Sequence, residues 1–161
     1  MATGPRLTIA PVSFNAGAPG SAFPAYSAPG IDVAGTGGTA FATAWSTTLG
    51  VMIPNNGLIW LYYVCGTTAG GVVQVLVGDV EGNTGQVLPA TTETYTIGAS
   101  TSGWLGPWAP GTYNQQQPTN VTYSGAINTT ALVAAAQNCV VVDFTTTTTL
   151  CVRAYQNAPA T

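Results

Sequence analysis

The chain of 161 residues contains no histidine and no lysine, and Arg6 and Arg153 are its only cationic residues. Serine, threonine and cysteine nucleophiles normally need a histidine or a lysine nearby to accept their proton, so this absence argues against nucleophilic catalysis. Nucleic-acid binding needs a basic surface that neutralises phosphates, and two arginines in a chain of net charge −3 do not supply one. We therefore expect a protein that is not an enzyme and does not bind nucleic acid.

Charge of either sign is scarce, because charged residues make up 4% of the chain compared with roughly 25% in ordinary globular proteins. Asp79 and Glu81 lie two residues apart, but no neighbouring polar groups suggest the cleft that paired-carboxylate catalysis requires. We assign them to a strand end or a turn. The remaining acids, Asp32, Glu93 and Asp143, are scattered and do not form a calcium loop. We expect neither a metal nor a cofactor.

Long apolar runs are missing as well. The most apolar run, Leu58 to Cys65, is far shorter than the roughly 20 residues of a membrane-spanning helix. The residues after Met1 are small and polar, unlike a secretory signal, so we expect synthesis in the cytoplasm and no membrane association. The three cysteines, Cys65, Cys139 and Cys151, lack the spacing of zinc ligands and the even count of a disulfide scaffold. We interpret them as buried thiols, with one incidental disulfide as the alternative.

Residues 1–44 are rich in glycine, proline and alanine, which disfavour a helix or a central strand. This composition predicts an extended N-terminal arm. The arm also carries four aromatic residues, Phe14, Phe23, Tyr26 and Phe41, for which a solvated linker would have little use. We expect part of the arm to dock on a neighbouring subunit or on another protein. The alternative is a tail, or a loop that belongs to its own domain.

Residues 45–161 consist of short β-rich runs separated by turn signals, with 46% hydrophobic residues in the whole chain arguing against disorder. Asn56-Gly57 between two apolar runs predicts a hairpin. The spacing of the runs predicts an all-β fold, a jelly-roll-like or immunoglobulin-like β-sandwich of about eight strands, following the extended arm. Residues 130–138 form either a short helix or an ordered loop.

Trp104, Trp108 and Tyr113 lie among prolines and glycines. They form either a platform for stacking on sugars or a structural group that closes the end of the sandwich or covers a subunit seam. We favour the structural interpretation. Two matches to the glycosylation pattern, at Asn120 and Asn128, are assigned to chance in a region rich in asparagine and threonine.

The stretches IPNNGLIWLYYVCG, TYTIGASTSGWLGPWAPGTYN, VTYSG and VRAY follow one another between Gly50 and Tyr155. Their order resembles small β-sandwich proteins encoded near the head genes of tailed bacteriophages, the capsid decoration or cement proteins. The most specific element is Gly-Pro-aromatic-x-Pro-x-x-Tyr at residues 106–113. This chain differs from the family pattern at Leu58 and Ile59, where a cationic residue is expected, and in an insert at about residues 129–138.

The resemblance implies a structural virion protein on the outer surface of an icosahedral head. Its partners would be the major capsid protein and further copies of itself, a homotrimer being our first expectation because a shell offers three-fold positions. The alternative is a carbohydrate- or receptor-binding sandwich of a tail or fibre, which would use Trp104, Trp108 and Tyr113.

Overall fold

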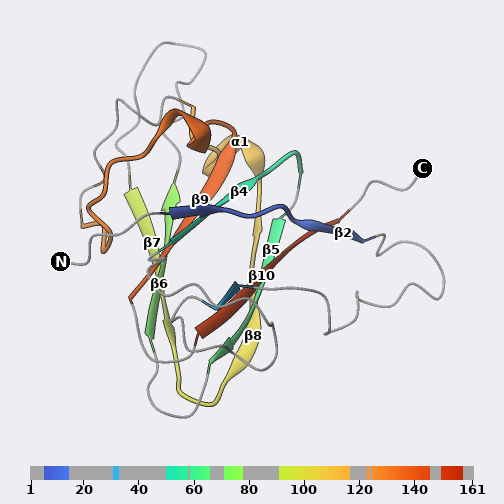
Figure 1. Cartoon of the computed structure of the whole chain (residues 1–161), viewed down its shortest axis with the longest axis vertical. Helices are drawn as coiled ribbons and strands as arrows, with labels where there is room; N and C mark the ends of the chain where they lie inside the picture. Colours follow the sequence, from blue (N-terminus) through green and yellow to red (C-terminus); the bar gives the residue numbers. More distant parts are fainter. Residues whose placement is uncertain are drawn as a thin grey trace.

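The computed structural model describes residues 6–14, 31–32, 50–57, 59–65, 71–77, 91–116, 123, 125–145 and 150–157 (Figure 1). Its strands are β1 (Arg6–Thr8), β2 (Val12–Phe14), β3 (Ile31–Asp32), β4 (Gly50–Pro54), β5 (Ile59–Cys65), β6 (Gly71–Val77), β7 (Thr91–Ile97), β8 (Ser102–Trp108), β9 (Cys139–Phe144) and β10 (Leu150–Asn157). The helical turns are α1 (Pro110–Tyr113) and η2 (Ala134–Ala136). No helix in these ranges is long and apolar enough to cross a membrane.

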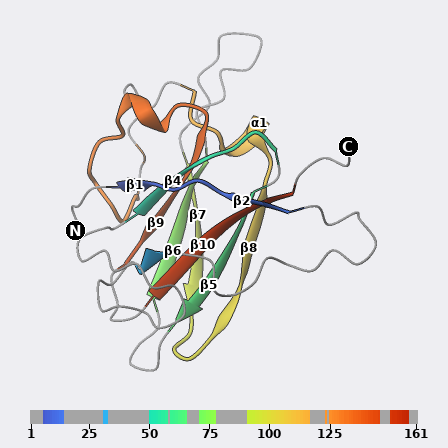
Figure 2. The ribbon, with the colours of Figure 1, turned by 45° about the vertical axis from the view of Figure 1, so that its right-hand side comes forward.

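The strands form two sheets, which Figure 2 shows as two layers. We call β1-β4-β9-β6-β7 the β4 sheet and β2-β10-β5-β8 the β5 sheet, in which β3 also pairs with β10. The predicted all-β sandwich is confirmed. The described residues contain ten strands instead of about eight, because the segment assigned to the arm contributes the short strands β1, β2 and β3.

The main core lies between the two sheets, where alternate residues of the longer strands face inward. Its members are mostly valine, isoleucine and leucine, whose branched side chains pack well on a pleated surface. The β4 sheet contributes Val51, Ile53, Val73, Val75, Ile97, Val140, Val142 and Phe144. The β5 sheet contributes Ile59, Leu61, Cys65, Trp108, Leu150, Val152 and Ala154.

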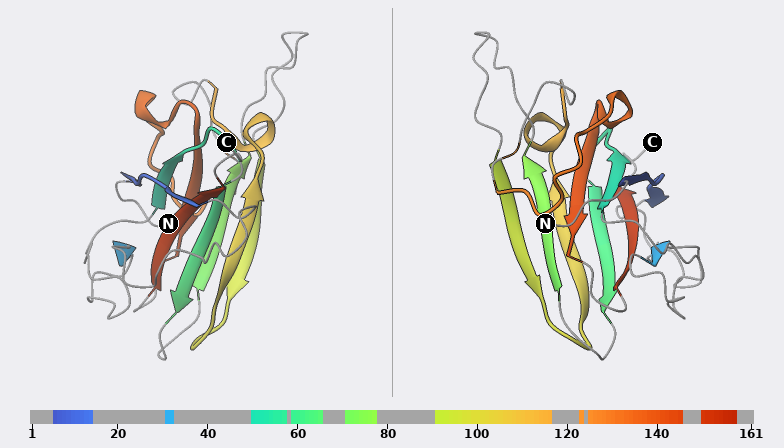
Figure 3. Two further views of the ribbon diagram at one scale, coloured as in Figure 1. Left: turned by 90° about the vertical axis from the view of Figure 1, so that its right-hand side faces the viewer. Right: turned by 60° about the vertical axis from the view of Figure 1, so that its left-hand side comes forward.

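A second, smaller core covers the outer face of the β4 sheet. Met52, Leu76 and Val141 point to this side and pack against Leu132 and Ala136. Both of these residues belong to the loop before β9, whose ribbon is seen in Figure 3. Every residue of β9 is therefore buried, which explains the consecutive apolar residues Cys139–Val142 at its start. The uncertain segment 130–138 is an ordered loop that contains a single 3₁₀ turn, η2.

The hairpin predicted at Asn56-Gly57 is wrong, because β4 and β5 belong to different sheets. The reason is the buried side chain of Asn55. Its Nδ2 donates to the carbonyl of Trp108 at 3.1 Å and to Oδ1 of Asn114 at 2.8 Å, and Asn114 donates back to the carbonyl of Asn55 at 2.9 Å. These bonds hold the chain at a corner where it crosses from one layer to the other.

Residues 6–14, which we call the N-terminal strap, join the two layers (Figure 1). β1 pairs in parallel with β4, and β2 pairs in parallel with β10. Both strands occupy sheet edges, as expected for a segment interrupted by Pro11. Leu7 and Ile9 pack against the main core. Residues assigned to the arm thus belong in part to the sandwich of their own chain.

Of the four arm aromatics, Phe14 ends β2, where its backbone lies opposite Asn157. Phe23, Tyr26 and Phe41 lie outside the described residues.

Candidate functional site

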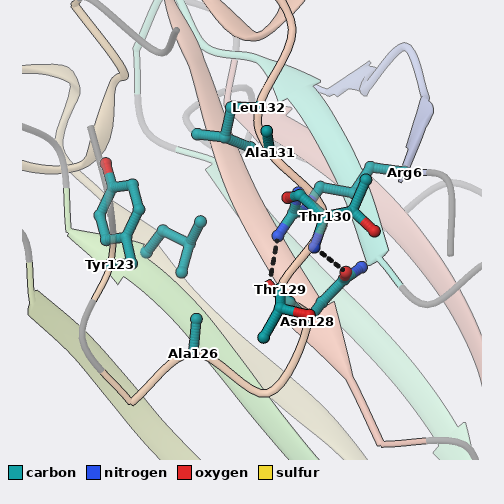
Figure 4. A pocket seen from close by; sticks show the side chains of 9 residues that line it. Arg6, Tyr123, Ala126, Asn128, Thr129, Thr130, Ala131 and Leu132 are labelled. Atoms are coloured by element: carbon teal, nitrogen blue, oxygen red, sulfur yellow. Dashed lines mark hydrogen bonds between the residues drawn. The ribbon is translucent and has the colours of Figure 1, made fainter. Parts of the chain in front are cut away.

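A buried ion pair joins the strap to the centre of the β4 sheet. Arg6 Nε lies 2.6 Å from Oδ1 of Asp143 in β9, and Nη2 donates to Oδ2 at 2.8 Å. The Arg6 guanidinium also donates to the carbonyl oxygens of Thr130 at 2.6 Å and Asn128 at 3.1 Å (Figure 4). Asp143 is 0% exposed, so this pair compensates a carboxylate that water does not reach.

The position of Asp143 depends on Gly50 in the neighbouring strand. A Cβ atom at residue 50 would collide with Oδ1 of Asp143 and lie 3.1 Å from Cγ of Arg6. Burial raises the pKa of the Asp143 carboxyl, while hydrogen bonds and positive charge from Arg6 act in the opposite direction. The site therefore needs a glycine, an arginine and an aspartate on three adjacent strands.

The same face carries a second buried polar group, Gln74 of β6. Its Nε2 donates to the carbonyl of Gly125 at 3.1 Å, and its Oε1 accepts from the amide of Ile127 at 2.8 Å. Together with Arg6, this glutamine fixes the loop over the sheet. A cavity of about 170 Å³ remains between the loop and the sheet, lined by Arg6, Leu76, Tyr123, Ala126, Asn128, Thr129, Thr130, Ala131 and Leu132 (Figure 4).

Asn128 is buried in this cluster, and its Oδ1 accepts from the amide of Thr130 at 3.0 Å. The match to the glycosylation pattern at this position is thus a structural asparagine in the folded chain.

The predicted group Trp104, Trp108 and Tyr113 does not form one surface. Trp108 is 1% exposed and belongs to the main core, whereas Trp104 is 38% exposed on the outer face of the β5 sheet. Residues four apart in a regular strand share a face, so β8 must change phase between them. It does so by one extra residue, because Ile59 pairs with Trp108 but Leu61 pairs with Leu105.

Gly106 makes this bulge possible. Its φ is +103°, and a Cβ atom there would lie 2.6 Å from the carbonyl oxygen of Ile59. The Gly-Pro-Trp motif therefore directs Trp108 inward and closes one end of the sandwich.

Trp104 belongs to an aromatic cluster on the outer face of the β5 sheet. Its ring centroid lies 4.8 Å from that of Tyr62 and 5.2 Å from that of Tyr155, both in tilted arrangements. Arg153 lies buried beside them, with its guanidinium carbon 5.9 Å from the Tyr155 centroid and Nη1 donating to the Tyr155 hydroxyl at 3.3 Å. This cluster is the second candidate surface.

Tyr113 ends α1 and is tied to β7 through Glu93. The hydroxyls of Tyr95 and Tyr113 donate to the two carboxylate oxygens of Glu93 at 2.8 and 3.0 Å. Burial and then Glu93 raise the pKa of Tyr95 to about 12, although the Trp108 side chain acts in the opposite direction. The same causes raise the pKa of Tyr113. Glu93 thus joins α1 to the edge of the β4 sheet.

Within the described ranges, no group of three or more acidic or cysteine side chains is arranged to hold a metal ion. Comparison with known proteins returned no matching family model, no matching curated protein and no matching solved structure.

The Arg6–Asp143 pair is the feature that the sequence interpretation missed. The sequence does contain an indication of this pair, because Asp143 interrupts an apolar run and a buried carboxylate needs a cation. Arg6 and Arg153 are the two possible cationic partners of Asp143 in the sequence. Nothing in the spacing distinguishes a partner 137 residues away from one ten residues away.

Proposed function

We propose that this chain is a structural virion protein, a capsid decoration or cement protein that binds the outside of an icosahedral phage head. The observation that carries the proposal is how its charges are placed. Arg6, Asp143 and Arg153 have buried side chains, and the half-buried Glu93 accepts two tyrosine hydroxyls. The charged side chains that the structure describes therefore add little charge to the surface, while the side chain of Asp32 and residues Asp79 and Glu81 lie outside this description.

A neutral surface suits contact with other protein subunits. Ionic groups at a seam lose hydration, and only well-placed partners compensate that loss. Exposed threonine, serine and alanine avoid this cost. An almost uncharged surface also provides no steering for charged ligands. Many copies on one shell add weak contacts together through multivalency. The partners in this proposal are the major capsid protein and further copies of the chain, with the trimer as the preferred assembly.

The proposed role requires no catalysis. The absence of histidine and lysine from the whole sequence supports a non-enzymatic protein.

Capsid binding tests the proposal directly. Empty heads assembled from the major capsid protein of the same genome are mixed with the purified chain and sedimented, and bound protein is quantified against concentration. Saturable binding at a fixed ratio to the capsid protein is expected. Failure of the folded chain to bind at any concentration would overturn the proposal.

Single charges on exposed residues then locate the binding face. Thr96→Glu on β7, Ser102→Glu on β8 and Val133→Glu beside η2 alter three separate positions without touching the core. A charge buried unpaired in the contact is expected to weaken binding by more than about tenfold, while a charge elsewhere leaves it unchanged. Equal binding by all three variants would exclude these positions from the contact.

One observation favours a second candidate function, a carbohydrate-binding sandwich of a tail or fibre. Trp104 is an exposed indole supported by two tyrosine rings, an arrangement that can stack on the apolar face of a sugar. Glycan-array binding that is lost in Trp104→Ala and retained in Val133→Ala, a change at the other large hydrophobic residue that is exposed in the described ranges, would favour this candidate. Trp108 is excluded from such a platform by its burial.

A further inference from the structure

Among the described residues, the partners of the N-terminal strap all lie at position 50 or later in the chain. β1 pairs with Gly50–Met52, the amide of Ile9 donates to the carbonyl of Met52 at 3.0 Å, and β2 pairs with Tyr155–Asn157. The side-chain contacts of Arg6 go to Asp143 and to the loop at 128–130. The acceptor surface for the strap is thus complete in residues 50–157.

The contacts of the strap do not depend on its being joined to the same chain. Adding a strand to a sheet edge uses backbone groups, and an identical segment from another molecule satisfies them equally well. Without a strap, both sheets would present unpaired edges, which a second β-segment readily occupies. The acceptor must therefore be filled, and its geometry specifies a strand parallel to β4 and β10.

Asp143 restricts which segment can fill the acceptor. It is fully buried on the strap side of the β4 sheet, so an incoming strand must bring a cation at the position of Arg6. The chain has no lysine, and its other arginine, Arg153, lies in β10 of the opposite sheet. Within an assembly of identical subunits, only a strap of this chain, its own or that of another copy, meets the requirement.

The covalent connection permits such an exchange. Residues 15–30 join β2 to β3, and 16 residues span at most about 50 Å when extended. This distance exceeds the width of two stacked sheets, whose layers lie about 10 Å apart. A strap can therefore reach an adjacent subunit even if β3 remains paired with its own β10.

We propose that the strap is exchanged between copies, so that Arg6 of one subunit pairs with Asp143 of the next and β1 and β2 extend the sheets of that neighbour. This inference rests on the homo-oligomer in the proposed function, but not on capsid binding. Exchange would make each subunit's buried ion pair depend on its neighbour and would link the oligomer through both sheets.

Isotope-resolved cross-linking tests the exchange. Ser13 and Gln156 are backbone register partners in the neighbouring strands β2 and β10, so the double variant Ser13→Cys/Gln156→Cys introduces one cysteine on each strand at paired positions. Chains labelled with ¹⁴N and ¹⁵N are unfolded together, refolded and oxidised, and the linked peptides are analysed by mass spectrometry. Peptides that join the two isotopes are expected. Linked peptides of a single isotope only would overturn the proposal. Ser13→Cys alone is the control and yields no link to residue 156.

A complementation experiment tests the same exchange without new thiols. Arg6→Ala leaves a buried carboxylate unpaired, and Asp143→Asn leaves the Arg6 guanidinium without its counter-ion. In an exchanged mixture of the two variants, the Arg6→Ala subunit keeps Asp143 and receives a strap with Arg6, so its ion pair is restored. The Asp143→Asn subunit receives a strap with alanine at position 6, so both positions there are neutral. The refolded mixture is expected to melt above both single variants. Melting of the mixture as two independent unstable proteins would overturn the exchange.

The failures of the two proposals are distinguishable. Capsid binding is measured on the same wild-type preparation as the oligomeric state. A chain that binds capsids as a monomer, with links of one isotope, retains the proposed function and loses the exchange. A chain that exchanges straps but does not bind capsids has the opposite outcome.

Discussion

The outer faces of the two sheets of the sandwich carry different kinds of side chains. The β4 sheet is buried on both sides at its centre, where the outer face contains Asp143 and Gln74, each with several hydrogen bonds or ionic contacts. Thr94 and Thr96 of its edge strand β7 are exposed. The β5 sheet has the aromatic cluster of Tyr62, Trp104 and Tyr155 on its outer face. Polar groups on the first sheet tolerate no loss of a partner, whereas ring contacts on the second weaken gradually. The two faces should therefore respond differently to substitution.

The largest effect is expected where the inner face of the β5 sheet is compared with its outer face. Trp108→Ala removes a fully buried ring from the main core and should lower the free energy of unfolding by about 4 kcal/mol. Trp104→Ala removes a partly exposed ring and should cost about 1 kcal/mol. Urea unfolding of both variants measures the difference. Equal losses would contradict the phase change that the bulge introduces in β8.

The β4 sheet should respond to loss of its ion pair. Arg6→Ala leaves Asp143 buried and unpaired, and we expect the free energy of unfolding at neutral pH to fall by about 3 kcal/mol. The double variant Arg6→Met/Asp143→Leu removes both charges and should recover most of this loss. Urea unfolding of the three proteins gives the comparison, and a double variant as unstable as the single one would contradict the role of the pair.

The pH dependence of Arg6→Ala gives a second measurement. Arg6 lowers the pKa of Asp143 against the effect of burial, so its removal should raise that pKa further. A folded-state pKa above the unfolded one favours folding at low pH, and the benefit is lost as pH rises through the folded value. The destabilisation by Arg6→Ala should therefore shrink as pH falls. A loss of stability that is independent of pH would show that Asp143 is not left unpaired.

A smaller effect is expected at the bulge of β8. Gly106→Ala places a methyl group against the carbonyl of Ile59 at a φ of +103°, and should cost about 2 kcal/mol. Gly125 is the matched control, because its φ is +78° and no atom lies within 4 Å of the position that a methyl group would take there. Gly125→Ala should cost about 1 kcal/mol from backbone conformation alone. Thermal or urea unfolding of both variants shows how much of the stability loss in Gly106→Ala comes from the collision with the carbonyl of Ile59. Identical losses in the two variants would exclude a contribution from the collision.

The smallest effect concerns the edge of the β4 sheet at high pH. The pKa of Tyr95 is raised from 10.0 to about 12, so the unfolded chain loses the phenolic proton before the folded chain does. The stabilisation is complete below the unfolded pKa and is lost as pH rises through the folded one. Stability should therefore decline between about pH 10 and about pH 12, and less steeply in Tyr95→Phe. Urea denaturation over this pH range measures the stability, and the absorbance of tyrosinate follows the ionisation of the tyrosines. An unchanged slope in Tyr95→Phe would contradict the assignment.

The sequence predicted the layers of the fold better than its connections. Alternation in the strands and the apolar run Cys139–Val142 are local patterns, and they reflect burial directly. The Asn-Gly signal failed at residues 56–57 because the side chain of Asn55 bonds to Asn114 and to the backbone of Trp108. Those contacts join positions more than fifty residues apart, and local turn chemistry does not reveal them.

The candidate site was predictable only in its parts. The sequence interpretation treated Trp104, Trp108 and Tyr113 as one group, whereas Trp108 alone of the two tryptophans is buried in the main core. The sequence did not indicate the one-residue bulge in β8 that places Trp104 and Trp108 on opposite faces of the β5 sheet. Residues 6–14 were assigned to an arm on composition, because three-residue strands at sheet edges carry little periodicity.

The sequence distance between the two members of the ion pair has a consequence for synthesis. Arg6 and Asp143 are separated by 137 residues, so the strap leaves the ribosome long before its last partner exists. Contacts between such distant residues form late and slowly, because a long loop must close first. On the nascent chain, a segment made early is therefore among the last to find its place, and straps of neighbouring polysomal chains would meet open acceptors during that interval.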